Sequence, residues 1–266
     1  DLFLFMSGFG LTCGALKKPL APLAFYQRRL VKVFIPFWVV LVLLFVFDAL
    51  VHGRFYGTDY VLRSLLGIFP RAGAFDDVNS PFWYITWLLL FYLLFPLTFM
   101  PRRAWLTALI LALIANVVAI TDPLQLQVTW LHRLHTCAFS LGILLAWWLQ
   151  TFPRAADALR TVRNRPGGIL RYVAIALGLC LAGYLALHNS SADWPRLSAW
   201  LHRAGVEPGV FVGQASSLFV MSALLLAFAL KRLDIGFLHL FGVYSYETYL
   251  LHWPLMVLAL AGCVLA

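Results

Sequence analysis

A cluster of basic side chains near the start of the chain has the chemistry needed to hold phosphate groups. Arg28, Arg29 and Lys32 lie close together, directly before an apolar stretch that contains Pro36 and Trp38. Guanidinium and ammonium groups bind phosphate oxygens through charge-assisted hydrogen bonds. Basic residues also accumulate in cytoplasmic loops of membrane proteins simply to set their orientation. The cluster alone is therefore compatible with a phosphate anchor and with a topology signal.

A second candidate lies in segment 242–254, near the end of the chain. Ser245, Tyr249 and His252 recur at helical spacing, so they share one face of the predicted helix. At 1.5 Å per residue, His252 lies about 13–14 Å from the cytoplasmic boundary of that helix, near the middle of a bilayer. An ionisable residue at this depth predicts a functional role. A structural histidine that hydrogen-bonds to a neighbouring helix is the alternative.

Small and aromatic residues form further motifs. Small residues in the first apolar stretch let a neighbouring helix or a substrate approach closely, although plain helix packing explains them equally well. Aromatic residues at the start of a later stretch are also expected of any membrane span. The residues that we expect to line a cavity or to belong to its motifs are Ser7, Gly8, Phe9, Trp83, Tyr84, Tyr246 and Trp253.

The composition excludes a soluble globular protein. Of the 266 residues, 62% are hydrophobic and 12% are charged, against about 45–50% and about 25% in soluble domains. The four cysteines lie far apart in apolar stretches, without the paired spacing that zinc or a redox dithiol requires. We therefore predict no metal site and no bound cofactor.

The elements that would position these candidate residues are predicted to be membrane-spanning helices. A spanning helix needs about 20 mostly apolar residues, and about eight stretches qualify when neighbouring helices cover the shorter ones. The patch from Tyr60 to Phe69 is too short and predicts a surface or re-entrant helix. The predicted fold is an all-α, polytopic transmembrane helix bundle in a single domain, residues 1–266. The predicted spans are 2–16, 32–51, 82–99, 104–121, 134–150, 170–187, 210–230 and 243–265.

The charged residues predict the orientation of this bundle. When alternate loops are assigned to the two sides, most of the 20 Lys and Arg residues fall on one side, and the acids lean to the other. Lys and Arg accumulate in cytoplasmic loops, so both ends of the chain are predicted to be external. The net charge of +9 then needs no nucleic-acid partner. The long outer loops, 52–81 and 188–208, are predicted to be structured lids.

Together these motifs resemble the acyltransferase 3 family of bacterial membrane O-acyltransferases, over nearly the whole chain. Residues 1–9 are similar to the family's second helix, and residues 28–32 to its cytoplasmic arginine motif. Residues 83–96 resemble its helix that ends in Phe-Tyr-Leu-Leu-Phe-Pro, and residues 244–254 its closing signature. The order, the spacing and the predicted sidedness of the four segments agree with the family.

The resemblance implies a reaction and its partners. An acyl group, often acetyl, would pass from cytoplasmic acyl-CoA to a hydroxyl of a surface polysaccharide or a lipid-linked sugar, in the bacterial inner membrane. Arg28, Arg29 and Lys32 would bind the acyl-CoA, while His252, Ser245 and Tyr249 would have a supporting role. A glycolipid or polysaccharide transporter is the main rival, but the inverted repeats that many transporters contain are absent from this sequence.

The sequence departs from the family pattern in three respects. The family's first helix, which carries an Arg and a His thought to act in catalysis, would precede Asp1, so the catalytic residue stays unassigned and an inactive fragment is a further alternative. Lys32 replaces the usual final Arg of the arginine motif, which keeps the charge but loses the planar two-point fork. Leu88 stands where many members have Glu.

Overall fold

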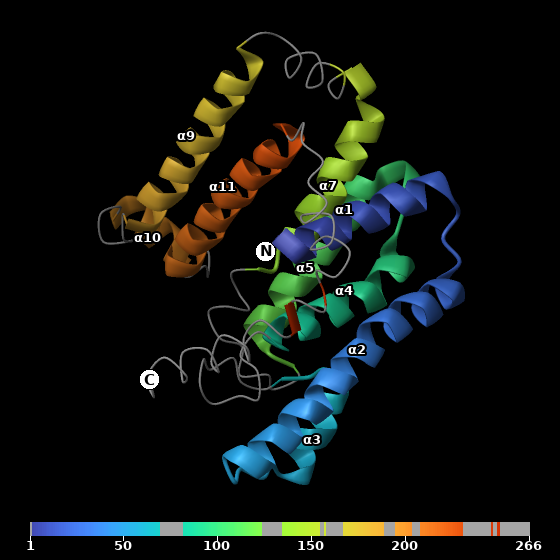
Figure 1. The fold of residues 1–266 in the computed structure, drawn as a ribbon. Coiled ribbons are helices and arrows are strands. Elements are labelled where there is room, and N and C mark those ends of the chain that lie inside the picture. Colours follow the sequence, from blue (N-terminus) through green and yellow to red (C-terminus); the bar gives the residue numbers. More distant parts are fainter. Residues whose placement is uncertain are drawn as a thin grey trace. The chain divides into compact units, whose positions relative to one another are not determined.

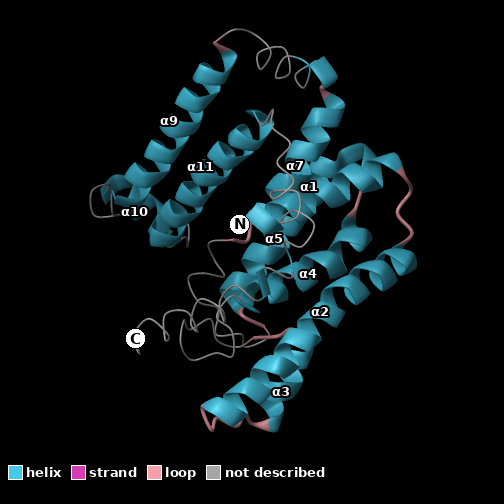
Figure 2. Ribbon diagram, viewed as in Figure 1, coloured by secondary structure: helices cyan, strands magenta, loops and turns pink. Residues whose placement is uncertain are grey.

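The computed structural model confirms an all-α fold. It describes residues 2–69, 82–123, 135–154, 157, 167–188, 195–203, 208–230, 246, 249 and 250. Within these residues the chain forms helices joined by loops and turns, and no strand (Figure 2). The α-helices, labelled in Figure 1, are α1 (Leu2–Lys17), α2 (Pro22–Val51), α3 (Thr58–Leu65), α4 (Trp83–Thr98), α5 (Ala104–Thr121), α7 (Ala138–Thr151), α9 (Gly168–His188), α10 (Pro195–Arg203) and α11 (Pro208–Leu230). A short 3-10 helix, η2 (Pro101–Arg103), precedes α5.

The described helices lie where the apolar stretches predict them. Helix α2 starts earlier than its predicted span, at Pro22, because proline fits the first turn of a helix, and the basic cluster continues that helix. Two helical stretches, Pro22–Val51 and Pro101–Thr121, are long and apolar enough to cross a bilayer by themselves. The other apolar helices are shorter, and the last predicted span lies almost wholly outside the described residues. The number of spans stays a prediction.

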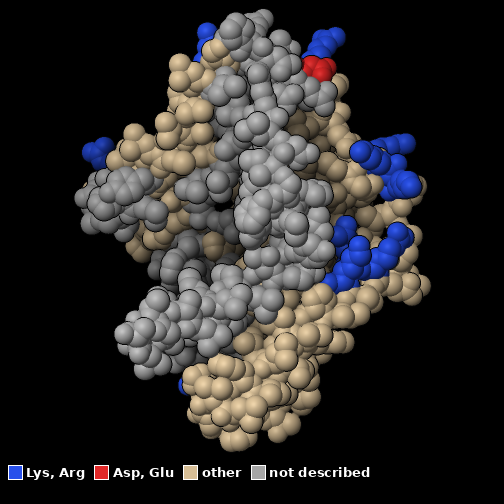
Figure 3. All heavy atoms as spheres, in the orientation of Figure 1, with Lys and Arg blue, Asp and Glu red and all other residues tan. Residues whose placement is uncertain are grey.

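Apolar residues are exposed at helical spacing, as expected of helices that face lipid. On α2 the exposed face carries Ile35, Val39, Val42, Val46 and Leu50. Such a stripe would be unfavourable in water, whereas lipid chains can cover it. Figure 3 shows that the visible charged side chains are mostly Lys and Arg, and that the lower part of the view, where the end of α2 and α3 lie, presents an almost uncharged face. These surfaces support a helical membrane protein.

The chain divides into two compact units, which are described separately. Unit 1 comprises Asp1–Pro19, Phe99–Asn116 and Arg133–Leu233, and unit 2 comprises Leu20–Thr98, Val117–His132 and Asp234–Ala266. The division does not test the predicted single membrane domain, which stays a prediction.

Within unit 1, helices α1 and α7 pack backbone against backbone. A side-chain carbon at Gly8 would collide with the carbonyl oxygen of Phe139, and one at Gly142 would collide with that of Phe5. Each glycine thus lies on the carbonyl of the phenylalanine three residues before the other glycine. Helices α9 and α11 form the other extensive contact in this unit (Figure 1).

Within unit 2, aromatic rings fill the space between helices. Phe25 of α2 packs against Tyr92 and Phe95 of α4, with ring centroids 6.2 Å apart in each case. Farther along α2, Phe37 lies 5.9 Å from Phe69 and 5.5 Å from Phe82. These contacts place the start of α2 beside the end of α4.

The short patch predicted between Tyr60 and Phe69 does contain a helix, α3. Trp38 of α2 donates a hydrogen bond from Nε1 to the carbonyl of Leu65, at 2.8 Å. The chain then turns at Gly67, whose φ of +76° favours glycine. Helices α3 and α10 also give helical structure to parts of the two long loops predicted as lids.

Candidate functional site

The basic cluster lies in the first turns of α2 and faces outward. Arg28, Arg29 and Lys32 are all exposed. Arg28 donates from Nε to the carbonyl of Ala24 in its own helix, at 3.1 Å. The cluster therefore offers three cationic groups on one short helical segment.

The helix that carries this cluster is attached to α4. Tyr26 donates its hydroxyl to the carbonyl of Leu93, at 2.8 Å. Phe25 contacts Tyr26 edge-on, with centroids 5.9 Å apart, in addition to its contacts with α4. The backbone that supports Arg28 and Arg29 is therefore held directly beside the Phe-Tyr-Leu-Leu-Phe-Pro segment.

The closing signature also reaches α2. Tyr246 donates its hydroxyl to the carbonyl of Val33, at 3.0 Å, directly after Lys32. Tyr249 lies against Tyr84 of α4, with ring centroids 4.9 Å apart. Unit 2 thus brings together three segments that are far apart in the sequence: the basic cluster, the aromatic helix and the closing signature.

The remaining predicted residues of unit 2 are placed as follows. Tyr84 is buried, and so is Leu88, the residue at the position where many members of the resembling family have Glu. Trp83 is the first residue of α4. Ser245, His252 and Trp253 lie outside the described residues, so their predicted roles stay predictions.

The Ser7, Gly8 and Phe9 motif belongs to unit 1. Gly8 is buried against the backbone of α7, which favours the packing interpretation of this residue. The ring of Phe9 stacks on that of Phe5, with centroids 6.5 Å apart. Ser7 is half-buried on the same helix. These contacts account for the small residue without a substrate.

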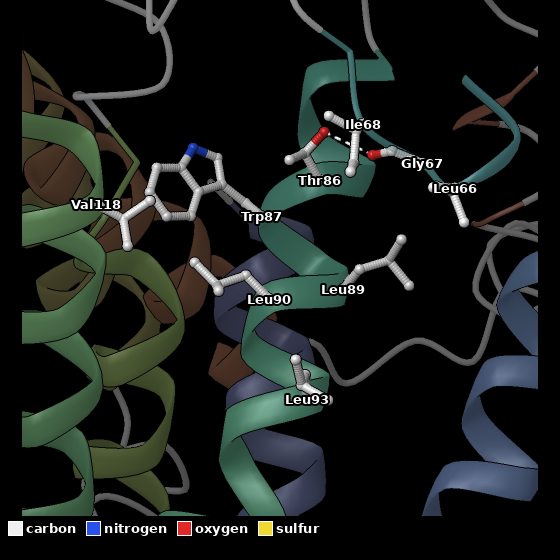
Figure 4. A pocket seen from close by; sticks show the side chains of 9 residues that line it. All are labelled: Leu66, Gly67, Ile68, Thr86, Trp87, Leu89, Leu90, Leu93 and Val118. Atoms are coloured by element: carbon white, nitrogen blue, oxygen red, sulfur yellow. Dashed lines mark hydrogen bonds between the residues drawn. The ribbon is translucent and has the colours of Figure 1, made fainter. Parts of the chain in front are cut away.

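An apolar cavity of about 200 Å³ lies between α4 and the turn that precedes it (Figure 4). Its polar atoms include the hydroxyl of Thr86, which donates to the carbonyl of Gly67 at 2.8 Å. Leu89, Leu90 and Leu93 form much of the wall. Because the hydroxyl and the carbonyl bond to each other, this cavity offers little to orient a reacting group, and we assign it no chemistry.

A titratable pair that the sequence motifs did not indicate lies at the end of α2. Tyr56 donates its hydroxyl to a carboxylate oxygen of Asp48, at 2.5 Å, and its ring stacks on Tyr60. Burial, followed by the hydrogen bond to Asp48 and the charge of that carboxylate, raises the pKa of Tyr56 to about 12. The phenol therefore stays protonated at neutral pH and acts as a donor that joins the end of α2 to the loop before α3.

A second group missed from the sequence is a neutral hydrogen-bond cluster in unit 1. The hydroxyl of Thr136 donates to Oδ1 of Asn116 and accepts from Nε2 of Gln214, both at 3.2 Å. Asn116 also donates to Sγ of Cys137, at 3.6 Å. Single amides inside the apolar stretches 104–121 and 210–230 were the available signal. Sequence spacing alone could not show that they meet.

A match to a protein family agrees with this helical architecture. A helical bundle with exposed apolar stripes is typical of a helical membrane protein. The family model described as "Acyltransferase domain" matches residues 1–260. The chain therefore belongs to the acyltransferase 3 family and carries an acyltransferase domain. No curated protein and no solved structure matches it.

Proposed function

We propose that this chain is a membrane O-acyltransferase that moves an acyl group, in the simplest case acetyl, from acyl-CoA to a sugar hydroxyl. In this reaction the hydroxyl oxygen attacks the thioester carbonyl, a C–O bond forms and the C–S bond breaks. The hydroxyl proton leaves through a base and is returned to the sulfur, so that CoA departs as a thiol. The acceptor is a surface polysaccharide or a lipid-linked sugar. No catalytic base is assigned.

The observation that carries the proposal is the convergence of three motifs on the start of α2. Tyr26 joins this region to α4, and Tyr246 joins it to the closing signature. Arg28, Arg29 and Lys32 remain exposed beside these contacts. Such an arrangement suits a donor with several phosphates, because rigid support of the backbone reduces the ordering that binding requires.

The proposed orientation follows from the same residues. The start of α2 lies in the cytoplasm, where acyl-CoA is available, because its basic residues disfavour translocation. The protein lies in the bacterial inner membrane, and the acceptor is supplied from the membrane or from its outer face. His252, Ser245 and Tyr249 line or support the path between the two substrates.

The experiment measures thiol release from acetyl-CoA by membranes that contain the full-length protein, with Arg29→Ala as the test variant. Loss of one charge-assisted hydrogen bond, about 1.5–3 kcal/mol, should raise the KM for acetyl-CoA by about tenfold or more. Arg103→Ala is the matched control, because Arg103 is also exposed and lies on the same predicted side.

Unchanged donor kinetics in folded Arg29→Ala protein would leave the cluster as a topology signal. Transport of a glycolipid without consumption of acetyl-CoA would instead favour the carrier alternative.

A further inference from the structure

Helix α3 runs back along α2 in the opposite direction. Four contacts show this, because each later residue of the α3 segment meets an earlier residue of α2. They join Tyr56 to Asp48, Tyr60 to Phe45, Leu65 to Trp38 and Phe69 to Phe37. The segment therefore passes from the end of α2 toward its middle (Figure 1).

The contact with Trp38 places the end of α3 relative to the bilayer. The cytoplasmic boundary on α2 is marked by Lys32, the last cation of the basic cluster, or by Phe25, which contacts the end of α4. At about 1.5 Å per residue, Trp38 lies about 9 Å beyond the first marker and about 20 Å beyond the second. Both depths fall inside an apolar layer about 30 Å thick.

The turn after α3 needs no water to satisfy its backbone. The N–H groups of residues 66–68 bond to carbonyls of α3. The carbonyl of Leu65 accepts from Trp38 of α2, at 2.8 Å. The carbonyl of Gly67 accepts from Thr86 of α4, also at 2.8 Å. A turn in water can leave such groups to the solvent, whereas inside lipid the protein itself must supply their partners.

The exposed side chains of α3 change from charged to apolar along the helix. Leu62 and Leu66, toward its end, are 58% and 64% exposed. Asp59 and Arg63 form an ion pair at 3.0 Å. Helical side chains tilt toward the N-terminus, so the pair is directed to the predicted external side. Pairing also lowers the cost of placing these charges near lipid.

We propose that α3 and its turn are inserted into the bilayer from the external side, with Leu62 and Leu66 against the hydrocarbon chains of the outer leaflet. The sequence left a surface helix and a re-entrant helix open for this segment, and the contacts with α2 and α4 favour insertion. The inference does not depend on the proposed acyl transfer.

The test measures the depth of single fluorescent labels in liposomes of brominated lipids. Leu66→Cys is compared with Val39→Cys, which lies next to Trp38 on α2, and Phe55→Cys with Leu50→Cys near the end of α2. All four positions are exposed, so a label fits at each. The full-length protein carries alanine at its native cysteines, which include Cys13, Cys137, Cys180 and Cys263.

Bromine deep in the acyl chains should quench the label at Leu66→Cys as strongly as the label at Val39→Cys. The ratio of deep to shallow quenching at both should exceed the ratio at Phe55→Cys by about twofold or more, because the positions differ in depth by a large part of the layer. In intact cells, a membrane-impermeant maleimide should react with Phe55→Cys, and with Leu66→Cys only after denaturation.

Two outcomes would overturn the proposal. Quenching at Leu66→Cys that resembles Phe55→Cys, with deep quenching at Val39→Cys, would make α3 a surface helix. Weak quenching at both Leu66→Cys and Val39→Cys would show that α3 and the end of α2 project into water. Neither result bears on thiol release from acetyl-CoA, so a failure here is distinguishable from a failure of the proposed function.

Discussion

In unit 1 the backbones of α1 and α7 touch at two glycines, whereas in unit 2 aromatic rings separate α2 from α4. Gly8 and Gly142 leave no space for a side chain between their helices. Phe25, by contrast, fills the gap toward α4 with a ring. Inside a bilayer there is no hydrophobic driving force between helices, so close backbone contact stabilises their association through dispersion energy.

We expect the two regions to have different roles: the α1–α7 contact supports the fold, and the start of α2 binds a ligand. The α1–α7 contact brings the two backbones together at Gly8 and Gly142, where no side chain would fit. The start of α2 is held by side chains, and its cations remain exposed. We therefore expect substitutions in the first region to affect folding, and substitutions in the second to affect stability less and donor binding more.

The largest effect is expected at Gly8. Gly8→Ala adds a methyl group onto the carbonyl of Phe139, which should destabilise the protein by about 1–3 kcal/mol, the typical range for overpacking. The measurement is thermal unfolding of purified protein in detergent. Gly10→Ala is the control, because nothing lies within 4 Å of the added carbon. Equal stability of the two variants would contradict the close contact.

A smaller effect is expected at Tyr246. Tyr246→Phe removes its bond to the carbonyl of Val33, and interhelical hydrogen bonds in membrane proteins contribute about 0.6 kcal/mol on average, with a maximum of about 1.7 kcal/mol. Thermal unfolding should shift downward by a few degrees. Tyr26→Phe should shift it less, because the bond of Tyr26 to Leu93 is exposed. An unchanged unfolding temperature for Tyr246→Phe would contradict the attachment of the closing signature to α2 through this hydrogen bond.

The smallest effect is expected at Tyr56 and depends on pH. The pKa of this phenol is raised from 10.0 to about 12 in the folded protein. The stabilisation by protonated Tyr56 is therefore fully present below pH 10 and is lost as the pH rises toward 12. The stability difference between wild type and Tyr56→Phe should be constant from pH 7 to 9 and should shrink above pH 10. A difference that grows above pH 10 would contradict the shift.

The helices were predictable because apolar composition and length determine them. The bounds of α5 follow directly from its apolar run. The basic cluster was also found from the sequence, since cations before an apolar stretch are conspicuous. The start of α2 at Pro22 was not predicted. The basic residues lower the hydropathy of this segment, so an apolar run cannot indicate that it is helical.

The tertiary contacts of the site could not be predicted in this way. The bond between Tyr246 and Val33 joins residues more than 200 positions apart, and no local pattern specifies such a pairing. The cluster of Asn116, Thr136 and Gln214 was missed for the same reason. Each is a single polar residue in its own stretch, and only packing brings the three together.

The central claim is that the cations at the start of α2 bind the phosphates of acyl-CoA. The most direct measurement compares the affinities of the full-length protein for acetyl-CoA and for acetyl-dephospho-CoA, which lacks the 3′-phosphate. Wild type should bind acetyl-CoA about tenfold or more tightly. A variant with Arg28→Ala, Arg29→Ala and Lys32→Ala should lose this preference, and one with Arg102→Ala and Arg103→Ala should keep it. An undiminished preference in the triple variant would contradict the account.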